Sequence, residues 1–138
     1  MADIPEKKVG IVSCSGEGCV EGTISRVATR LVLEKLRPNE TVTICLPLFL
    51  AGGREERTFA RYYPTITVDG CDKLCAKIGT ERYSGKPASS IVVTDLTKGW
   101  NCSSLGSRRK LNDETRSVAE RVAETIASEV DQVLEHWR

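Results

Sequence analysis

Cysteines are the side chains best able to do chemistry in this chain of 138 residues, which has six of them. Five of them end or follow short apolar runs: Cys14, Cys45, Cys71, Cys75 and Cys102. The sixth, Cys19, lies in the turn after the first of these runs. A thiolate sulfur binds zinc or iron and is also the nucleophile of thiol enzymes. Thiols that meet at one end of a molecule therefore indicate a metal site or a redox centre.

The spacing of the cysteines favours a shared site. Cys71 and Cys75, in the string VDGCDKLC, are four residues apart, which on a helix would put both sulfurs on one face. In a first helical turn, exposed N–H groups and the helix dipole would favour the thiolate form of Cys71. Cys14 and Cys45 would end neighbouring strands, about 5 Å apart. Four thiolates from three adjacent segments could complete a tetrahedral zinc site or hold an iron–sulfur cluster.

The same cysteines have other interpretations. A free cysteine packs well as a small apolar side chain, which is a simple account of Cys45. Cys14 with Cys19, or Cys71 with Cys75, could instead cycle between dithiol and disulfide in a redox or sulfur-transfer enzyme. A cysteine phosphatase loop is disfavoured, because that chemistry wants an arginine six residues after Cys14, where this chain has valine.

Four short apolar, β-branched runs predict the strands that would carry these thiols. They are Lys8–Cys14, Thr41–Leu46, Thr65–Val68 and Ser90–Asp95. Helical spacing of apolar residues from Val20 onward, ended by Pro38, predicts a helix after the first strand. A second, charged helix is expected at Arg54–Tyr63, after an apolar loop at Pro47–Gly53.

Two further helices complete the pattern. The first runs from about Gly70 to Ile78, with Asp69 as its cap and Gly79 at its left-handed exit. The last follows a cap at Asn112 or Asp113 and carries a long apolar stripe. That stripe comprises Val118, Val122, Ile126, Val130, Val133, Leu134 and Trp137.

Strands that alternate with helices predict an α/β fold. We expect a small single domain over residues 1–138, a three-layer sandwich of about four parallel strands with helices on both faces. A flavodoxin-like order would place the first strand beside the second and third. In such sheets, sites lie outside the carboxyl ends of the strands, where the cysteines fall.

Composition excludes several function classes. A net charge of +1 gives no bias toward nucleic acid. The chain starts without a recognisable signal peptide and has no apolar run of about 20 residues, so we expect no membrane partner and a cytoplasmic protein with reduced thiols. The single histidine, His136, is expected on the surface, far from the cysteines in sequence. The apolar segment Leu46–Ala51 leaves open a partner surface, and the sequence does not decide between a protein partner, a homo-oligomer and neither.

Three short motifs resemble one known family. CSG at Cys14–Gly16, CL at Cys45–Leu46 and DGCxxxC at Asp69–Cys75 resemble the DGC-domain family of zinc-binding proteins, named for its Asp-Gly-Cys motif. The resemblance covers about residues 9–98 and implies four ligand cysteines, which map onto Cys14, Cys45, Cys71 and Cys75. It implies no activity. Cys19 and Cys102 fall outside the pattern, although Cys19 is close enough to compete for a ligand position.

These observations lead to one hypothesis and its rivals. We expect a protein that binds one zinc ion through cysteine thiolates, in a structural, metal-handling or sensing role. Four sulfur ligands leave no position for a catalytic water, whereas three would leave one open and make an enzyme plausible. The alternatives are a thiol redox or sulfur-transfer enzyme and an iron–sulfur carrier that use the same cysteines.

Overall fold

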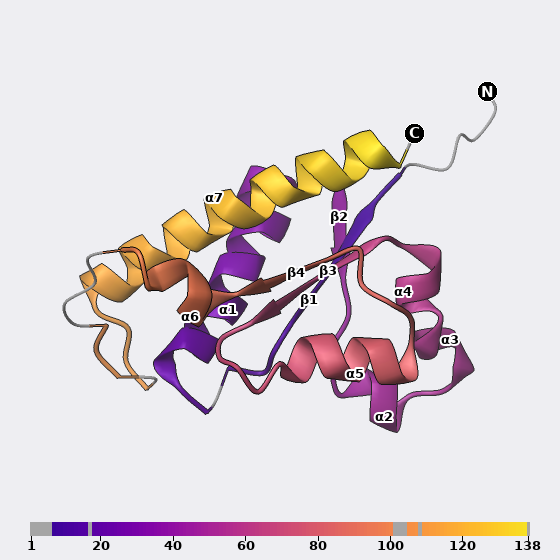
Figure 1. The fold of residues 1–138 in the computed structure, drawn as a ribbon, viewed down its shortest axis with the longest axis horizontal. Coiled ribbons are helices and arrows are strands. Elements are labelled where there is room, and N and C mark those ends of the chain that lie inside the picture. Colours follow the sequence, from indigo (N-terminus) through magenta and orange to yellow (C-terminus); the bar gives the residue numbers. More distant parts are fainter. Residues whose placement is uncertain (1–6, 17, 101–104, 108, 138) are drawn as a thin grey trace.

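Four parallel strands form one sheet in the order β2-β1-β3-β4 (Figure 1). The computed structural model describes residues 7–16, 18–100, 105–107 and 109–137. The strands are β1 (Val9–Ser13), β2 (Thr41–Thr43), β3 (Thr65–Asp69) and β4 (Ser89–Val92). β1 pairs with both β2 and β3, which confirms the predicted order.

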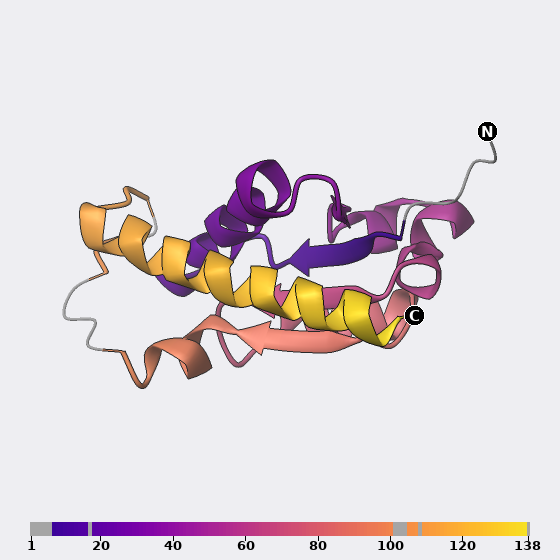
Figure 2. The same cartoon turned by 90° about the horizontal axis from the view of Figure 1, so that it is seen from above.

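Two long helices cover one face of the sheet. Helix α1 (Val20–Leu31), extended by a π-helical turn at Val32–Leu36, packs against α7 (Asp113–His136), which runs across the whole sheet (Figures 1 and 2). The larger core lies between these helices and the sheet. The first four residues of the predicted apolar stripe of α7 are buried in it: Val118, Val122, Ile126 and Val130. Asn112 is the helix cap, and its side-chain oxygen accepts from Thr115 N at 2.8 Å, as predicted.

Shorter helices cover the other face. Helix α5 (Cys75–Tyr83) lies beneath β3, next to α2 (Leu48–Ala51), α3 (Arg54–Arg57) and α4 (Phe59–Tyr62) (Figure 1). A smaller core fills this layer, made of Val12, Phe49, Phe59 and Ala76 with partly buried neighbours. Helices thus lie on both faces of the sheet, and the predicted α/β architecture is confirmed.

Several predicted boundaries were wrong. The strand formed by the fourth apolar run ends at Val92, and the chain continues as helix α6 (Val93–Thr97). Val93 is buried in the larger core from a helical turn, so its apolar character did not distinguish a strand from a helix. The second strand stops at Thr43, where its ladder with β1 ends. The expected loop at Pro47–Gly53 contains α2, and the expected helix at Arg54–Tyr63 is two short helices separated at Thr58.

The helix expected from Gly70 to Ile78 begins five residues later, at Cys75. Gly79 therefore lies inside α5 and does not form its exit. Leu74 precedes the helix in a left-handed conformation with φ of 55°, so the chain between β3 and α5 is a turn. Cys71 and Cys75 consequently do not share one helix face.

Candidate metal centre

Cys14 leaves the sheet directly after β1. Its N–H donates to Val68 O at 3.0 Å, which ties the start of this turn to the neighbouring strand β3. Its sulfur lies 3.1 Å from the hydroxyl oxygen of Ser25, a fully buried residue of α1. The Ser25 hydroxyl in turn donates to Gly22 O at 2.6 Å, so the Cys14 thiol is the donor between sulfur and hydroxyl.

Three more thiols lie close to this turn. Cys19 is the N-cap residue of α1, and it interacts electrostatically with Cys71. Cys75, the first residue of α5, interacts electrostatically with both Cys14 and Cys71. Thiols from two turns, the one after β1 and the one after β3, therefore lie at the carboxyl edge of these strands.

The surroundings of two of these thiols hold them neutral. Burial raises the pKa of the Cys75 thiol, and the nearby Asp69 carboxylate and the sulfurs of Cys14 and Cys71 raise it further. Burial also raises the pKa of Cys19, with a smaller contribution from Cys71. Negative charge is thus disfavoured in the metal-free cluster, and a bound cation would reverse that preference.

Close contact between glycines brings the two turns together. A Cβ atom on Gly70 would lie 2.3 Å from Gly22 N, so the backbone after β3 touches the first turn of α1 with no side chain between them. Gly16 has a φ of 86°, and a Cβ there would lie 2.8 Å from Gly22 O. Sequence reasoning missed this role. The available signal was Gly22 itself, a glycine inside the first turn of a predicted helix.

The turn from Cys71 to Leu74 is held by a buried carboxylate. Asp69 is 2% exposed and accepts from Ala76 N at 2.6 Å and from Lys77 N at 3.1 Å. It therefore caps α5 as predicted, but from across the turn. Burial raises the pKa of Asp69, against the two N–H groups that lower it.

The residues of the Asp-Gly-Cys motif thus have three separate tasks. Asp69 caps a helix, Gly70 permits the backbone contact and Cys71 supplies a thiol.

The family model described as the DGC domain matches residues 10–130. The chain belongs to the DGC-domain family. No curated protein and no solved structure matches it.

The DGC-domain cysteines differ in how far the structure brings them together. All five described cysteines are free thiols. Cys45 is exposed beyond the end of β2, and its thiol makes no hydrogen bond to another described cysteine. Cys102 lies outside the described residues. Within the described part of the chain, no three Cys, His, Asp or Glu side chains are grouped closely enough to hold a metal ion as they stand. The donor chemistry suits zinc, and ligation would require the thiols to close in.

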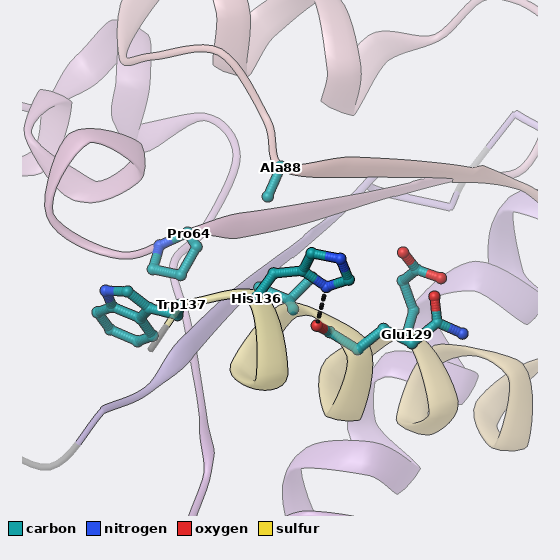
Figure 3. Close-up of a pocket in the computed structure, with 7 residues that line it drawn as sticks. Pro64, Ala88, Glu129, His136 and Trp137 are labelled. Atoms are coloured by element: carbon teal, nitrogen blue, oxygen red, sulfur yellow. Dashed lines mark hydrogen bonds between the residues drawn. The ribbon is translucent and has the colours of Figure 1, made fainter.

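The single histidine lies at the other edge of the DGC domain. A pocket there is formed by Pro64 and Ala88, which precede β3 and β4, and by the last turns of α7 (Figure 3). His136 is exposed in this pocket, and its Nδ1 lies 2.8 Å from Gln132 O. His136 is on the surface, as predicted, and these residues flank the amino ends of the strands, away from the cysteines.

The helices described here show no candidate for a membrane span. The longest, α7, alternates buried apolar positions with exposed charged ones. It packs against α1 and the sheet through its apolar face.

Proposed function

We propose that this DGC domain binds one zinc ion through cysteine thiolates at the carboxyl edge of its sheet. The observation that carries the proposal is the proximity of Cys75 to Cys14 and Cys71, with which its thiol interacts electrostatically although Cys14 belongs to a different segment. Cys19 or Cys45 would supply a fourth sulfur. Of these two, Cys19 has the stronger support, because it lies near enough to Cys71 to interact with it electrostatically.

The electrostatics of the cluster also support a cation. Thiols with raised pKa values remain protonated at neutral pH, and zinc would replace those protons with its own charge. Four thiolates close the coordination sphere, which favours a structural, metal-handling or sensing role. The thiols must stay reduced to bind zinc, which fits a function in the cytoplasm.

Metal analysis of the full chain, purified without oxygen, tests the proposal. We expect about one zinc per chain and a colourless protein, since an iron–sulfur cluster would absorb visible light. Separate Cys14→Ser, Cys71→Ser and Cys75→Ser variants should each weaken zinc binding by about 100-fold or more. Cys19→Ser and Cys45→Ser then identify the fourth ligand.

Cys102→Ser is the matched control, because Cys102 lies outside the family's four-cysteine pattern. It should retain the affinity of the unmodified chain. The proposal is wrong if the anaerobic protein does not take up zinc in competition with a chromogenic chelator. It is equally wrong if serine at position 71 or 75 leaves the affinity unchanged.

A thiol redox function is the second candidate, favoured by the electrostatic interaction between the nearby Cys19 and Cys71 thiols. This pair differs from those that sequence spacing suggested. An organic hydroperoxide could oxidise it, taking two electrons and two protons to give a disulfide, an alcohol and water. Peptide mass spectrometry after peroxide treatment should then find a Cys19–Cys71 disulfide. Its absence, with zinc bound, excludes this candidate.

A further inference from the structure

The pocket around His136 lies at the amino edge of the sheet, apart from the cysteines. It has a volume of about 440 Å³, within the range of small-molecule sites in proteins. One face of the last turns of α7 forms one wall, and the chain that enters β3 and β4 forms the other (Figure 3). The side chains on these walls indicate which class of molecule fits.

Glu129 brings a negative charge to the pocket. Its side chain is half-buried, and no residue that the structure describes forms an ion pair with it. The carboxylate extends from α7 toward the strands, on the side where Ala88 lies (Figure 3). A partly desolvated carboxylate without a counter-ion favours a cationic occupant.

His136 adds a hydrogen-bond acceptor. Its Nδ1 lies 2.8 Å from Gln132 O, and because a carbonyl oxygen only accepts, Nδ1 carries the proton. In the neutral ring, Nε2 is then an acceptor. Glu129 and His136 are two helical turns apart and share one face of α7. His136 also lies in the last turn, where the negative end of the helix dipole favours a cation.

The remainder of the lining suits a carbon body. Pro64 and Ala88 lie on the sheet side, and Val133 and Trp137 lie on the helix side. Trp137 is eight residues beyond Glu129, which is about 12 Å along a helix. The Trp137 end already attracts one cation, since Lys7 Nζ lies 5.8 Å from the ring centre and 3.4 Å from Trp137 O. Lys7 does not line the pocket and so leaves it open to a ligand.

We infer that this pocket binds a small organic guanidinium with an apolar body. The Glu129 carboxylate and His136 Nε2 would accept from its N–H groups, while Pro64, Val133 and Trp137 would cover its carbon atoms. A guanidinium fits better than an ammonium, because its planar fork pairs with a carboxylate through two hydrogen bonds and is more weakly hydrated. The pocket contains none of the described cysteines, so its ligand is independent of the zinc proposed above.

An NMR titration of the full chain with N-phenethylguanidinium tests this site. Amide signals of Ala88 and of residues 129–137 should shift, and those of Cys14 and Cys71 should not. N-phenethylurea has the same shape without the charge and should bind at least about tenfold more weakly. Phenethylammonium should also bind more weakly than the guanidinium. Equal binding of the guanidinium and the urea, or of the guanidinium and the ammonium, would overturn the inference.

Three variants show whether binding depends on this pocket. Glu129→Gln should weaken guanidinium binding by about tenfold and leave urea binding unchanged. Glu135→Gln is the matched control, because Glu135 is exposed near the same end of α7 but does not line the pocket. An equal loss in the control would show a general attraction between charges and no site. Ala88→Trp fills the pocket from an exposed position, and guanidinium binding that survives this substitution would overturn the placement.

An arginine side chain of another protein offers the same charged group. A capped Gly-Arg-Gly peptide presents it on a polar backbone, whose burial against the apolar wall would cost hydrogen bonds to water. The peptide should therefore bind more weakly than N-phenethylguanidinium in the same titration. Tighter binding of the peptide would overturn the assignment to a small molecule.

Discussion

The sulfur of Cys14 lies 3.1 Å from the hydroxyl oxygen of Ser25, which is fully buried in α1. The Ser25 hydroxyl donates to Gly22 O and accepts from the Cys14 thiol. Ser25 therefore holds the Cys14 side chain from inside the helix that adjoins the cluster.

Replacing Ser25 by alanine should destabilise the fold, because the hydrogen bond between the Cys14 thiol and the Ser25 hydroxyl is lost. We expect a loss of about 1 kcal/mol in the free energy of unfolding, measured in urea. Thr29→Val is the matched control, because the buried Thr29 hydroxyl has no hydrogen-bond partner among the described residues. An equal effect of the two substitutions would show that helix packing, and not the hydrogen bond, sets the change in stability.

Substituting Gly70 by alanine should destabilise the fold. The added Cβ would lie 2.3 Å from Gly22 N, a backbone atom that cannot move without shifting α1. We expect a loss of about 3 kcal/mol in the free energy of unfolding, measured in urea. Gly18→Ala should change it by less than about 0.5 kcal/mol, since a Cβ there meets nothing within 4 Å.

The left-handed conformation of Leu74 predicts an unusual ranking of two substitutions. Glycine adopts a φ of 55° without strain, whereas alanine does not. Leu74→Gly should therefore be more stable than Leu74→Ala by about 1 kcal/mol in urea unfolding. Inside a helix alanine is normally more stable than glycine. At exposed Arg116 in α7, Arg116→Ala should therefore be more stable than Arg116→Gly in the same experiment. A matching ranking at both positions would rule out strain at Leu74.

The charge on Asp69 should be detectable at Cys75. Its carboxylate raises the pKa of that thiol, second only to burial. Asp69→Asn removes the charge and keeps an oxygen that can accept from Ala76 N, so the pKa of Cys75 should fall. The pH dependence of alkylation, followed by peptide mass spectrometry, measures this shift. Cys45 in the same protein is the internal control, and a Cys75 profile that does not move contradicts the prediction.

Stability should decline in alkaline solution. Cys19 and Cys75 have pKa values raised above 9.0 in the folded chain, so the folded state holds protons that the unfolded state releases first. Stability is therefore complete below pH 9 and falls as the pH rises through 9 toward the folded-state pKa values. Urea midpoints between pH 7.5 and 10.5 measure the fall. A Cys19→Ser, Cys75→Ser double variant should show a shallower one.

Sequence patterns predicted the architecture well because it depends on buried, periodic apolar positions. The runs at Val9–Ser13 and Thr65–Asp69 could be buried only as central strands, and the stripe on α7 required a helix over the sheet. The alternation of strands and helices predicted a parallel sheet, for which a flavodoxin-like strand order was expected. Sites in such sheets lie at the carboxyl edge, where the thiols of the turns after β1 and β3 are found.

The local geometry of the site was less predictable, because it depends on contacts between distant segments. The spacing of Cys71 and Cys75 favours a helix, yet the contact of Gly70 with Gly22 and the reach of Asp69 to Ala76 produce a turn. Similarly, Val93 satisfies its burial in a helix although it continues an apolar strand pattern. Propensity within a short window carries no information about such partners.

The contact among Gly16, Gly22 and Gly70 has a consequence for recognising relatives of this chain. Because backbone touches backbone there, the separation of the thiols depends on three positions that carry no functional group. A homologue that keeps the cysteines but has a larger residue at one of these glycines should have lost the arrangement. The three glycines are therefore as informative as the cysteines for recognising relatives that keep this arrangement of thiols.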